Sequence, residues 1–228
     1  MTSKKRKGTK GLKRDQFFEF AKDFAPLTQT QSEAYQDYKD GKSLMLCGYP
    51  GTGKTYIACA LALEELINQT KEAIRIVRCA VSTRDIGFQP GDEAEKMSVY
   101  EKPYIPMVND IVGRGDAYNT LKLQDRIKFE STSFLRGVTY HNCVVIVDEF
   151  QSMNFHEINT IITRMGKNST LIFCGDDGQC DVKKHESGYE EVLRIMKKLP
   201  KWFSIHQFQA DDIVRSGMVK DWIIAANS

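Results

Sequence analysis

Residues 48–55 read Gly48-Tyr49-Pro50-Gly51-Thr52-Gly53-Lys54-Thr55. This stretch fits the pattern G-x-x-x-x-G-K-[ST] of a phosphate-binding loop, or P-loop, at every position. The glycines let backbone N–H groups turn inward around a polyphosphate, Lys54 reaches the β- and γ-phosphate oxygens, and the Thr55 hydroxyl binds Mg²⁺. The pattern therefore predicts that these eight residues bind a nucleoside triphosphate, with Lys54 also catalytic.

The flanks of this loop supply the context that the pattern needs. The apolar run Ser43–Cys47 favours a buried strand before it, and Tyr56–Asn68 favours a helix after it. The N-terminus of that helix adds partial positive charge beside bound phosphates. A strand, a loop and a helix in this order distinguish a P-loop from a chance match in a glycine-rich surface loop.

Length and composition are typical of one soluble globular domain. The chain has 228 residues, and none of its apolar runs approaches the roughly 18–20 residues of a membrane span. No signal peptide opens it, so we expect a cytoplasmic protein with no membrane partner. The six cysteines include no C-x-x-C pair, which favours small buried hydrophobes in a reducing compartment over a zinc site or disulfides.

The net charge of +2 conceals an uneven distribution. Residues 1–14 carry seven basic side chains and no acidic one, which leaves 25 basic and 30 acidic residues, net −5, in residues 15–228. A basic arm can bind nucleic acid by releasing counterions. A solvated, disordered tail that aids solubility is the alternative, and we expect residues 1–14 to be disordered in either case.

Strands alternate with helices along the rest of the chain. Further strands are expected at Ala73–Cys79, Lys128–Thr132, Cys143–Asp148, Ser169–Cys174 and Phe203–Phe208. Helices are expected up to Lys39, at 104–112, 117–126, 154–166 and 187–198, and from about Asp212. This alternation predicts a three-layer α/β fold with a mostly parallel sheet in a single domain. Residues 80–100 are expected to be loops, and Asp15–Phe24 a short helix whose phenylalanines pack on the domain.

Acidic side chains follow the predicted strands. Because the carboxyl ends of parallel strands meet at one edge of the sheet, Lys54, Asp148 and Asp176 are expected to gather there. Asp148 is suited to hold Mg²⁺, since a hard cation prefers oxygen ligands. Glu149 is the candidate base that orients or deprotonates the attacking water. The alternative role for Glu149 is to cap the following helix.

Two glutamines are further candidates. Gln179 follows the Ser169–Cys174 strand by a short turn and is expected to hydrogen-bond the γ-phosphate and the attacking water, as a catalytic residue that passes nucleotide state to a loop. Gln31 lies upstream of the P-loop strand, where its amide can read adenine through a paired donor and acceptor.

These segments together resemble the PhoH-like family of P-loop ATPases, which is similar to the first RecA-like domain of superfamily-1 helicases such as RecD. The resemblance covers residues 27–222. It is carried by the P-loop, Val147-Asp148-Glu149-Phe150-Gln151, Gly87-Phe88-x-Pro90-Gly91-Asp92 and Gly175-Asp176-x-x-Gln179-x-Asp181. Phe150 and Cys180 depart from the family pattern, and both are apolar. The resemblance implies a RecA-type ATPase domain over residues 15–228 that uses ATP and Mg²⁺.

The resemblance also implies a partner for catalysis. Superfamily-1 motors have two RecA-like domains, the second of which supplies arginines to the transition state, and this chain has room for the first alone. We therefore expect a homo-oligomer, most simply a hexameric ring, with an arginine donated in trans. Arg215 is the preferred donor because it is expected to begin the last helix; Arg136, Arg78 and Arg84 are the others.

Several functions are compatible with this pattern. The first is an ATPase that acts on single-stranded RNA or DNA, held by Arg84, Phe88, Arg136 and the basic arm. The second is a nucleotide-dependent regulatory or assembly switch without motor activity. The third is a metal-dependent nuclease that uses the acidic residues Asp148, Glu149 and Asp176. A small-molecule kinase is disfavoured because the sequence shows no lid-like arginine cluster.

Overall fold

The structure, a computed structural model, describes residues 16–79, 93–132, 135, 137–176 and 187–226. The basic arm and the candidate residues Arg84, Phe88, Arg136 and Gln179 lie outside this set. Within these ranges, no helix combines the length and the apolar character needed to cross a lipid bilayer.

Six strands form one sheet in the order β3-β2-β4-β5-β1-β6. Their bounds are Ser43–Gly48 (β1), Ala73–Arg78 (β2), Ile127–Ser131 (β3), Cys143–Asp148 (β4), Thr170–Cys174 (β5) and Phe203–Phe208 (β6). Every neighbouring pair is parallel, so all six carboxyl ends meet at one edge. β1 lies between β5 and β6, and its carboxyl end continues into the P-loop.

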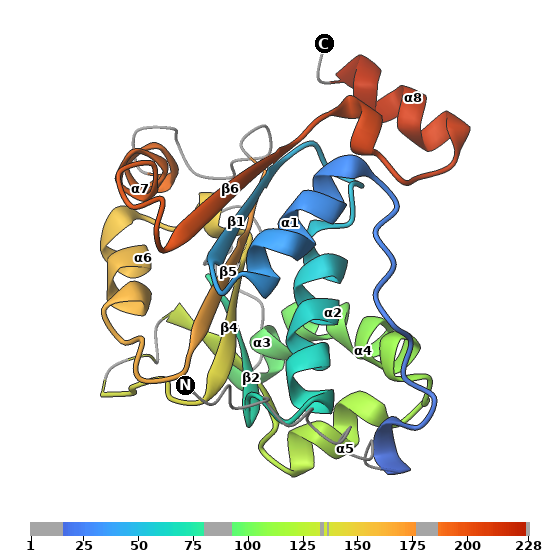
Figure 1. Cartoon of the computed structure of the whole chain (residues 1–228), viewed down its shortest axis with the longest axis vertical. Coiled ribbons are helices and arrows are strands. Elements are labelled where there is room, and N and C mark those ends of the chain that lie inside the picture. Colours follow the sequence, from blue (N-terminus) through green and yellow to red (C-terminus); the bar gives the residue numbers. More distant parts are fainter. Residues whose placement is uncertain (1–15, 80–92, 133–134, 136, 177–186, 227–228) are drawn as a thin grey trace, which may run out of the picture.

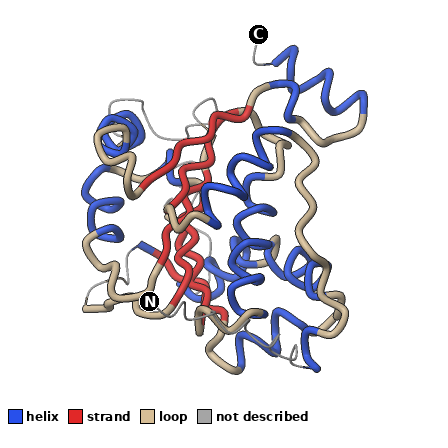
Figure 2. Tube along the Cα trace, in the orientation of Figure 1, coloured by secondary structure: helices blue, strands red, loops and turns tan. Residues whose placement is uncertain are grey.

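Helices cover both faces of the sheet, as Figures 1 and 2 show. One side carries α1 (Gln29–Lys39), α2 (Lys54–Ile67), α4 (Tyr104–Val112) and α5 (Ala117–Leu123). The other side carries α6 (Phe155–Ile162) and α7 (Tyr189–Met196). The predicted three-layer α/β fold is therefore confirmed. A last helix, α8 (Gly217–Ala226), projects beyond this body near the carboxyl end of the sheet (Figure 1).

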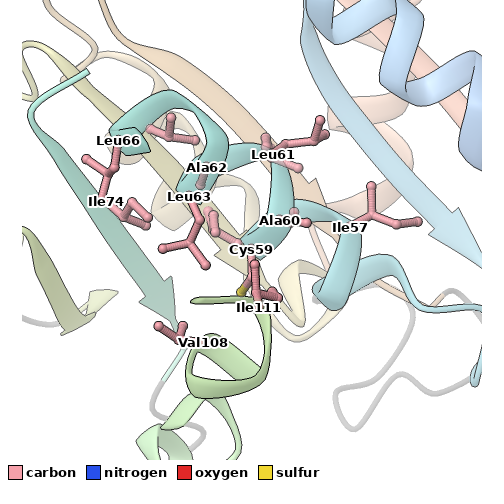
Figure 3. Close-up of a cluster of buried hydrophobic side chains, with 14 of the residues drawn as sticks. Ile57, Cys59, Ala60, Leu61, Ala62, Leu63, Leu66, Ile74, Val108 and Ile111 are labelled. Atoms are coloured by element: carbon pink, nitrogen blue, oxygen red, sulfur yellow. The ribbon is translucent and has the colours of Figure 1, made fainter. Parts of the chain in front are cut away.

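Helix α2 is the centre of the larger hydrophobic core. Nine of its residues, from Ile57 to Ile67, are buried. Figure 3 shows Leu63 and Leu66 beside Ile74 of β2, and Cys59 beside Ile111 of α4. A helix that is apolar nearly all round needs cover on every side, and here the sheet, α1 and α4 supply it. The N-terminus of α2, which ends the P-loop, is therefore rigidly held.

A second core lies under α6 and α7. The strand β4 is buried along its whole length, as expected for a continuous β-branched run covered by helices on both faces. Phe150 extends this core: its ring stacks on Tyr189 with centroids 5.1 Å apart and meets Phe173 edge-on at 5.5 Å. The two cores together fix the ends of β4 and β5.

Three local predictions were wrong. Residues 93–101 form a helix, α3 (Glu93–Glu101), where a loop was expected. Its residues are good helix formers, but the Pro90-Gly91 pair just before them dominated the pattern. Among residues 16–24, the described part of the predicted helix, only a 3₁₀ turn forms, at Gln16–Phe18. The expected packing of the phenylalanines holds for Phe17, Phe18 and Phe24, whereas Phe20 is 69% exposed. Finally, α8 begins at Gly217 instead of near Asp212.

Candidate nucleotide site

A pocket of about 270 Å³ lies at the carboxyl edge of the sheet. Its walls come from the P-loop, from the residues that end β4 and follow β5, and from two more distant side chains, Met107 of α4 and Arg215. The fold thus brings together Lys54, Asp148 and Asp176, as predicted from their places after apolar strands, and Glu149 lines the pocket beside them.

The P-loop backbone depends on its glycines. Gly48, Gly51 and Gly53 have φ values of 108°, 74° and 84°, in the left-handed region that side chains avoid. A Cβ on Gly48 would lie 2.2 Å from the Phe208 carbonyl oxygen of β6, so the strand pairing itself requires glycine there. The Lys54 Nζ donates to the carbonyl oxygens of Gly48 (2.8 Å) and Tyr49 (2.6 Å).

Lys54 lies in a partly buried, acidic environment. Burial lowers the pKa of its ammonium group, and the Asp176 carboxylate acts in the opposite direction. A cation that is partly stripped of water and aimed into a pocket interacts strongly with an anionic ligand. Lys54 is therefore suited to bind an anionic group in the pocket that it lines.

Asp148 is held from two sides. Thr55 donates its Oγ1 hydroxyl to Asp148 Oδ1 over 3.1 Å, and the Tyr104 hydroxyl donates to Oδ2 in a short hydrogen bond. The side chain is buried, and this burial raises the pKa of Asp148, while the Tyr104 hydroxyl opposes the shift. Tyr104 was not identified from the sequence, because nothing in its local pattern separates it from an ordinary core tyrosine.

These oxygens suit a magnesium ion. A hydroxyl and a carboxylate at the edge of a phosphate pocket are hard ligands, and Mg²⁺ is usually held by one or two protein oxygens plus the substrate phosphates. Within the described ranges, no three His, Cys, Asp or Glu side chains gather into a closed metal cage. Thr55 and Asp148 are therefore the residues that would hold the ion.

Glu149 has an unusual backbone and two side-chain partners. Its φ of 52° and ψ of 40° are left-handed, a conformation that costs free energy for a residue with a side chain. Gln151 donates its side-chain Nε2 to Glu149 Oε2 at 2.6 Å, and an Arg78 nitrogen lies 3.9 Å from Oε1. The Glu149 side chain makes no capping hydrogen bond to the following 3₁₀ turn. The alternative role as a helix cap is therefore wrong.

Gln151 connects this acid to the end of β5. Its side chain is buried, and the side-chain Oε1 accepts from the Asp176 backbone N–H at 3.1 Å. The backbone carbonyl oxygen of Gln151 accepts from the Ser187 hydroxyl at 2.7 Å. The close approach leaves no room for a side chain on Gly175, whose Cβ would lie 2.7 Å from Gln151 Oε1. The sequence analysis noted Gln151 only as part of the family pattern.

Gln31 lies beside the P-loop but does not line the pocket. It is 3% exposed; Nε2 donates to the Thr52 carbonyl oxygen at 3.1 Å, and Oε1 accepts from the Leu27 N–H at 2.8 Å. The side chain thus ties the P-loop to the segment before α1. Its contact with adenine stays a prediction.

Arg215 lines the pocket of its own chain, and its action in a neighbouring subunit stays a prediction. After β6 the chain returns over the P-loop, where the Val214 N–H donates to the Gly51 carbonyl oxygen at 3.1 Å. Arg215 therefore packs against Gly51: a Cβ added to Gly51 would lie 3.0 Å from the Arg215 Cγ. It precedes α8 by two residues and does not begin that helix.

Comparisons with known proteins identify the family of this chain. The family model for PhoH-like proteins matches residues 23–227. Protein PhoH of Escherichia coli K12 is 31% identical over 215 residues, which is 91% of this chain and 59% of that protein. A PhoH-like protein of Bacillus subtilis is 31% identical over 195 residues, 84% of this chain and 60% of its own length. The chain thus spans about three fifths of these curated relatives.

A solved structure shares the fold at low sequence identity. The large terminase of a thermophilic bacteriophage matches with a TM-score of 0.56 at 12% identity, over 87% of this chain and 50% of the terminase. Its complex with ADP matches with a TM-score of 0.52 at 13% identity, over 86% and 49%. The family model and the two relatives together show that the chain belongs to the PhoH-like family, with the P-loop fold that its sequence predicts.

Proposed function

We propose that this chain binds ATP together with Mg²⁺ and hydrolyses the γ-phosphate bond. The observation that carries the proposal is the convergence, in one pocket, of the Lys54 ammonium, the Thr55–Asp148 oxygen pair and the Glu149 carboxylate. Membership of the PhoH-like family supports it, as does the likeness of the fold to a terminase that binds ADP.

Each group has a role set by its position. The P-loop amides and Lys54 bind the β- and γ-phosphates, and Thr55 with Asp148 holds the metal. Bound Mg²⁺ supplies positive charge that offsets the charge developing on the phosphate oxygens. Glu149 accepts a proton from the attacking water, which Gln179 also orients. Arg215 offers a further cation to the transferred phosphoryl group from within the same chain.

Two variants test this proposal. Lys54→Ala should weaken the binding of ATP with Mg²⁺, measured by calorimetry. Glu149→Gln should leave that affinity within about twofold and lower phosphate release by a factor on the order of 10² or more, as expected for loss of a general base. Glu72→Gln, an exposed position before β2, is the matched control. Wild-type turnover by Glu149→Gln would show that another group is the base.

We further propose that hydrolysis is coupled to single-stranded RNA or DNA and that the active form is a homo-oligomer, a hexamer in the simplest case. Arg84, Phe88, Arg136 and the basic arm remain the candidates for the nucleic-acid contact. Poly-U or single-stranded DNA should stimulate ATP hydrolysis, with an effect that falls steeply as salt rises. A flat response would favour the nucleotide-dependent switch, and cleavage of the strand by Lys54→Ala without ATP would favour the nuclease.

A further inference from the structure

The two acids at the pocket have partners that converge on one short stretch of chain. Tyr104, the first residue of α4, contacts Asp148, and Tyr100, in the last turn of α3, contacts the arginine beside Glu149. We propose that this α3–α4 junction is the positioning element of the acid pair: Tyr104 aims Asp148 at the metal, and Tyr100 holds Arg78 against Glu149. The inference rests on the proposed function.

The position of Tyr104 is determined by packing. Its ring is 1% exposed and lies 5.5 Å from the Phe129 ring of β3, between centroids. The ring therefore cannot swing away, and its hydroxyl points at Asp148 Oδ2. Because Thr55 donates to the other oxygen, Oδ1, the carboxylate is held by a donor on each side. Asp148 also lines the pocket.

Tyr100 reaches its acid, Glu149, through Arg78. The Arg78 guanidinium lies over its ring, 5.2 Å from the centroid, and the same guanidinium lies 3.9 Å from Glu149 Oε1. A stacked guanidinium loses much of its freedom to reorient. The two tyrosines are four residues apart and reach the two acids by different routes, one through a hydroxyl and one through a cation.

The two contacts predict separable effects. Partners that orient a metal ligand typically change metal affinity by about 10- to 100-fold. Removing the Tyr104 hydroxyl should therefore weaken magnesium binding, whereas removing the Tyr100 ring should slow turnover and leave magnesium affinity unchanged. A purely structural role for either tyrosine would lower stability without this separation.

The first experiment uses Tyr104→Phe, which keeps the ring. Calorimetry measures ADP affinity with EDTA and across a magnesium titration. We expect the ADP affinity without metal to be unchanged. The magnesium concentration that gives half of the metal-dependent gain in ADP affinity should rise about tenfold. Tyr140→Phe is the matched control, because Tyr140 is also buried and its hydroxyl donates to a carboxylate away from this junction, Glu130, at 2.9 Å. Equal magnesium dependence in the two variants would overturn the role of Tyr104.

A double variant keeps this result interpretable. In the Asp148→Asn background, Tyr104→Phe should change the magnesium dependence by less than about twofold, because the ligand that it positions has already been altered. A further tenfold loss in that background would mean that Tyr104 acts elsewhere, and would overturn the proposal.

The second experiment compares Tyr100→Leu with Tyr100→Phe. The leucine variant should lower kcat about fivefold or more, with KM and the half-maximal magnesium concentration unchanged. The phenylalanine variant should keep the wild-type kcat, because it keeps the ring under Arg78. Equal rates in the two variants would contradict the role of Tyr100.

If the wild-type chain binds no ADP or ATP with Mg²⁺, the proposed function itself fails. If it binds them and the tyrosine variants match wild type, only this inference fails.

Discussion

Gln151 donates its side-chain amide to the Glu149 carboxylate at 2.6 Å and accepts the Asp176 backbone N–H through the same amide at 3.1 Å. One buried side chain therefore fixes both the candidate base and the first residues after β5. A left-handed residue such as Glu149 keeps its conformation only where its surroundings hold it. The hydrogen bond from Gln151 supplies part of that restraint.

Gln151→Leu should lower kcat by about tenfold or more and leave KM nearly unchanged, because the base loses its orientation while the phosphate contacts stay. It should also destabilise the fold by about 1–3 kcal/mol, since the Asp176 N–H loses its partner in a buried site. Steady-state kinetics and urea unfolding measure the two effects. Gln36→Leu, at an exposed glutamine that also bonds a carboxylate, is the control and should change neither quantity substantially.

Gly48→Ala should destabilise the fold by about 2–4 kcal/mol, because a Cβ would collide with the Phe208 carbonyl oxygen and the φ of 108° is unfavourable for alanine. Gly41→Ala is the matched control. Gly41 has a φ of 88° but no atom within 4 Å of the added Cβ, so only the backbone cost of about 1–2 kcal/mol applies. Equal losses in urea unfolding would show that the contact with β6 does not matter.

Arg215→Ala should reduce ATP turnover by a factor on the order of 10³ if the arginine stabilises the transition state. A mixing experiment tests the assignment to its own chain. When Arg215→Ala is mixed with Lys54→Ala under conditions that exchange subunits, activity should stay absent, because each chain has a defect in its own site. Recovery in the mixture would mean that the arginine reaches a neighbouring subunit after all.

Asp148→Asn should stabilise the folded protein at pH 7, because it removes a charge from a buried site. Burial raises the pKa of Asp148 above its unfolded value, so the folded state binds the proton more tightly. Its contribution to stability is most favourable below the unfolded pKa and is lost as pH rises through the folded pKa. The advantage of the asparagine should therefore shrink in unfolding experiments as pH falls; an advantage independent of pH would point to another cause.

Much of the fold could be predicted because its signals are local. The β-branched run of β4 requires burial on both faces, and the strand predicted at Phe203–Phe208 has the bounds of β6. Four of the five described cysteines are buried, in keeping with their apolar surroundings. The helix α3 was missed because the neighbouring proline and glycine outweighed a weak helical pattern.

Short-range patterns were enough to predict the P-loop and the strands that carry Asp148 and Asp176, and the parallel arrangement was enough to predict that these strands meet at one edge of the sheet. The return of Arg215 to the P-loop of its own chain, and the contacts of Tyr104 and Gln151 with the two acids, appear only in the folded chain. Those contacts join residues that are distant in the chain or, for Gln151 and Glu149, two residues of one turn. Their geometry depends on how helices and strands pack, which no local pattern encodes.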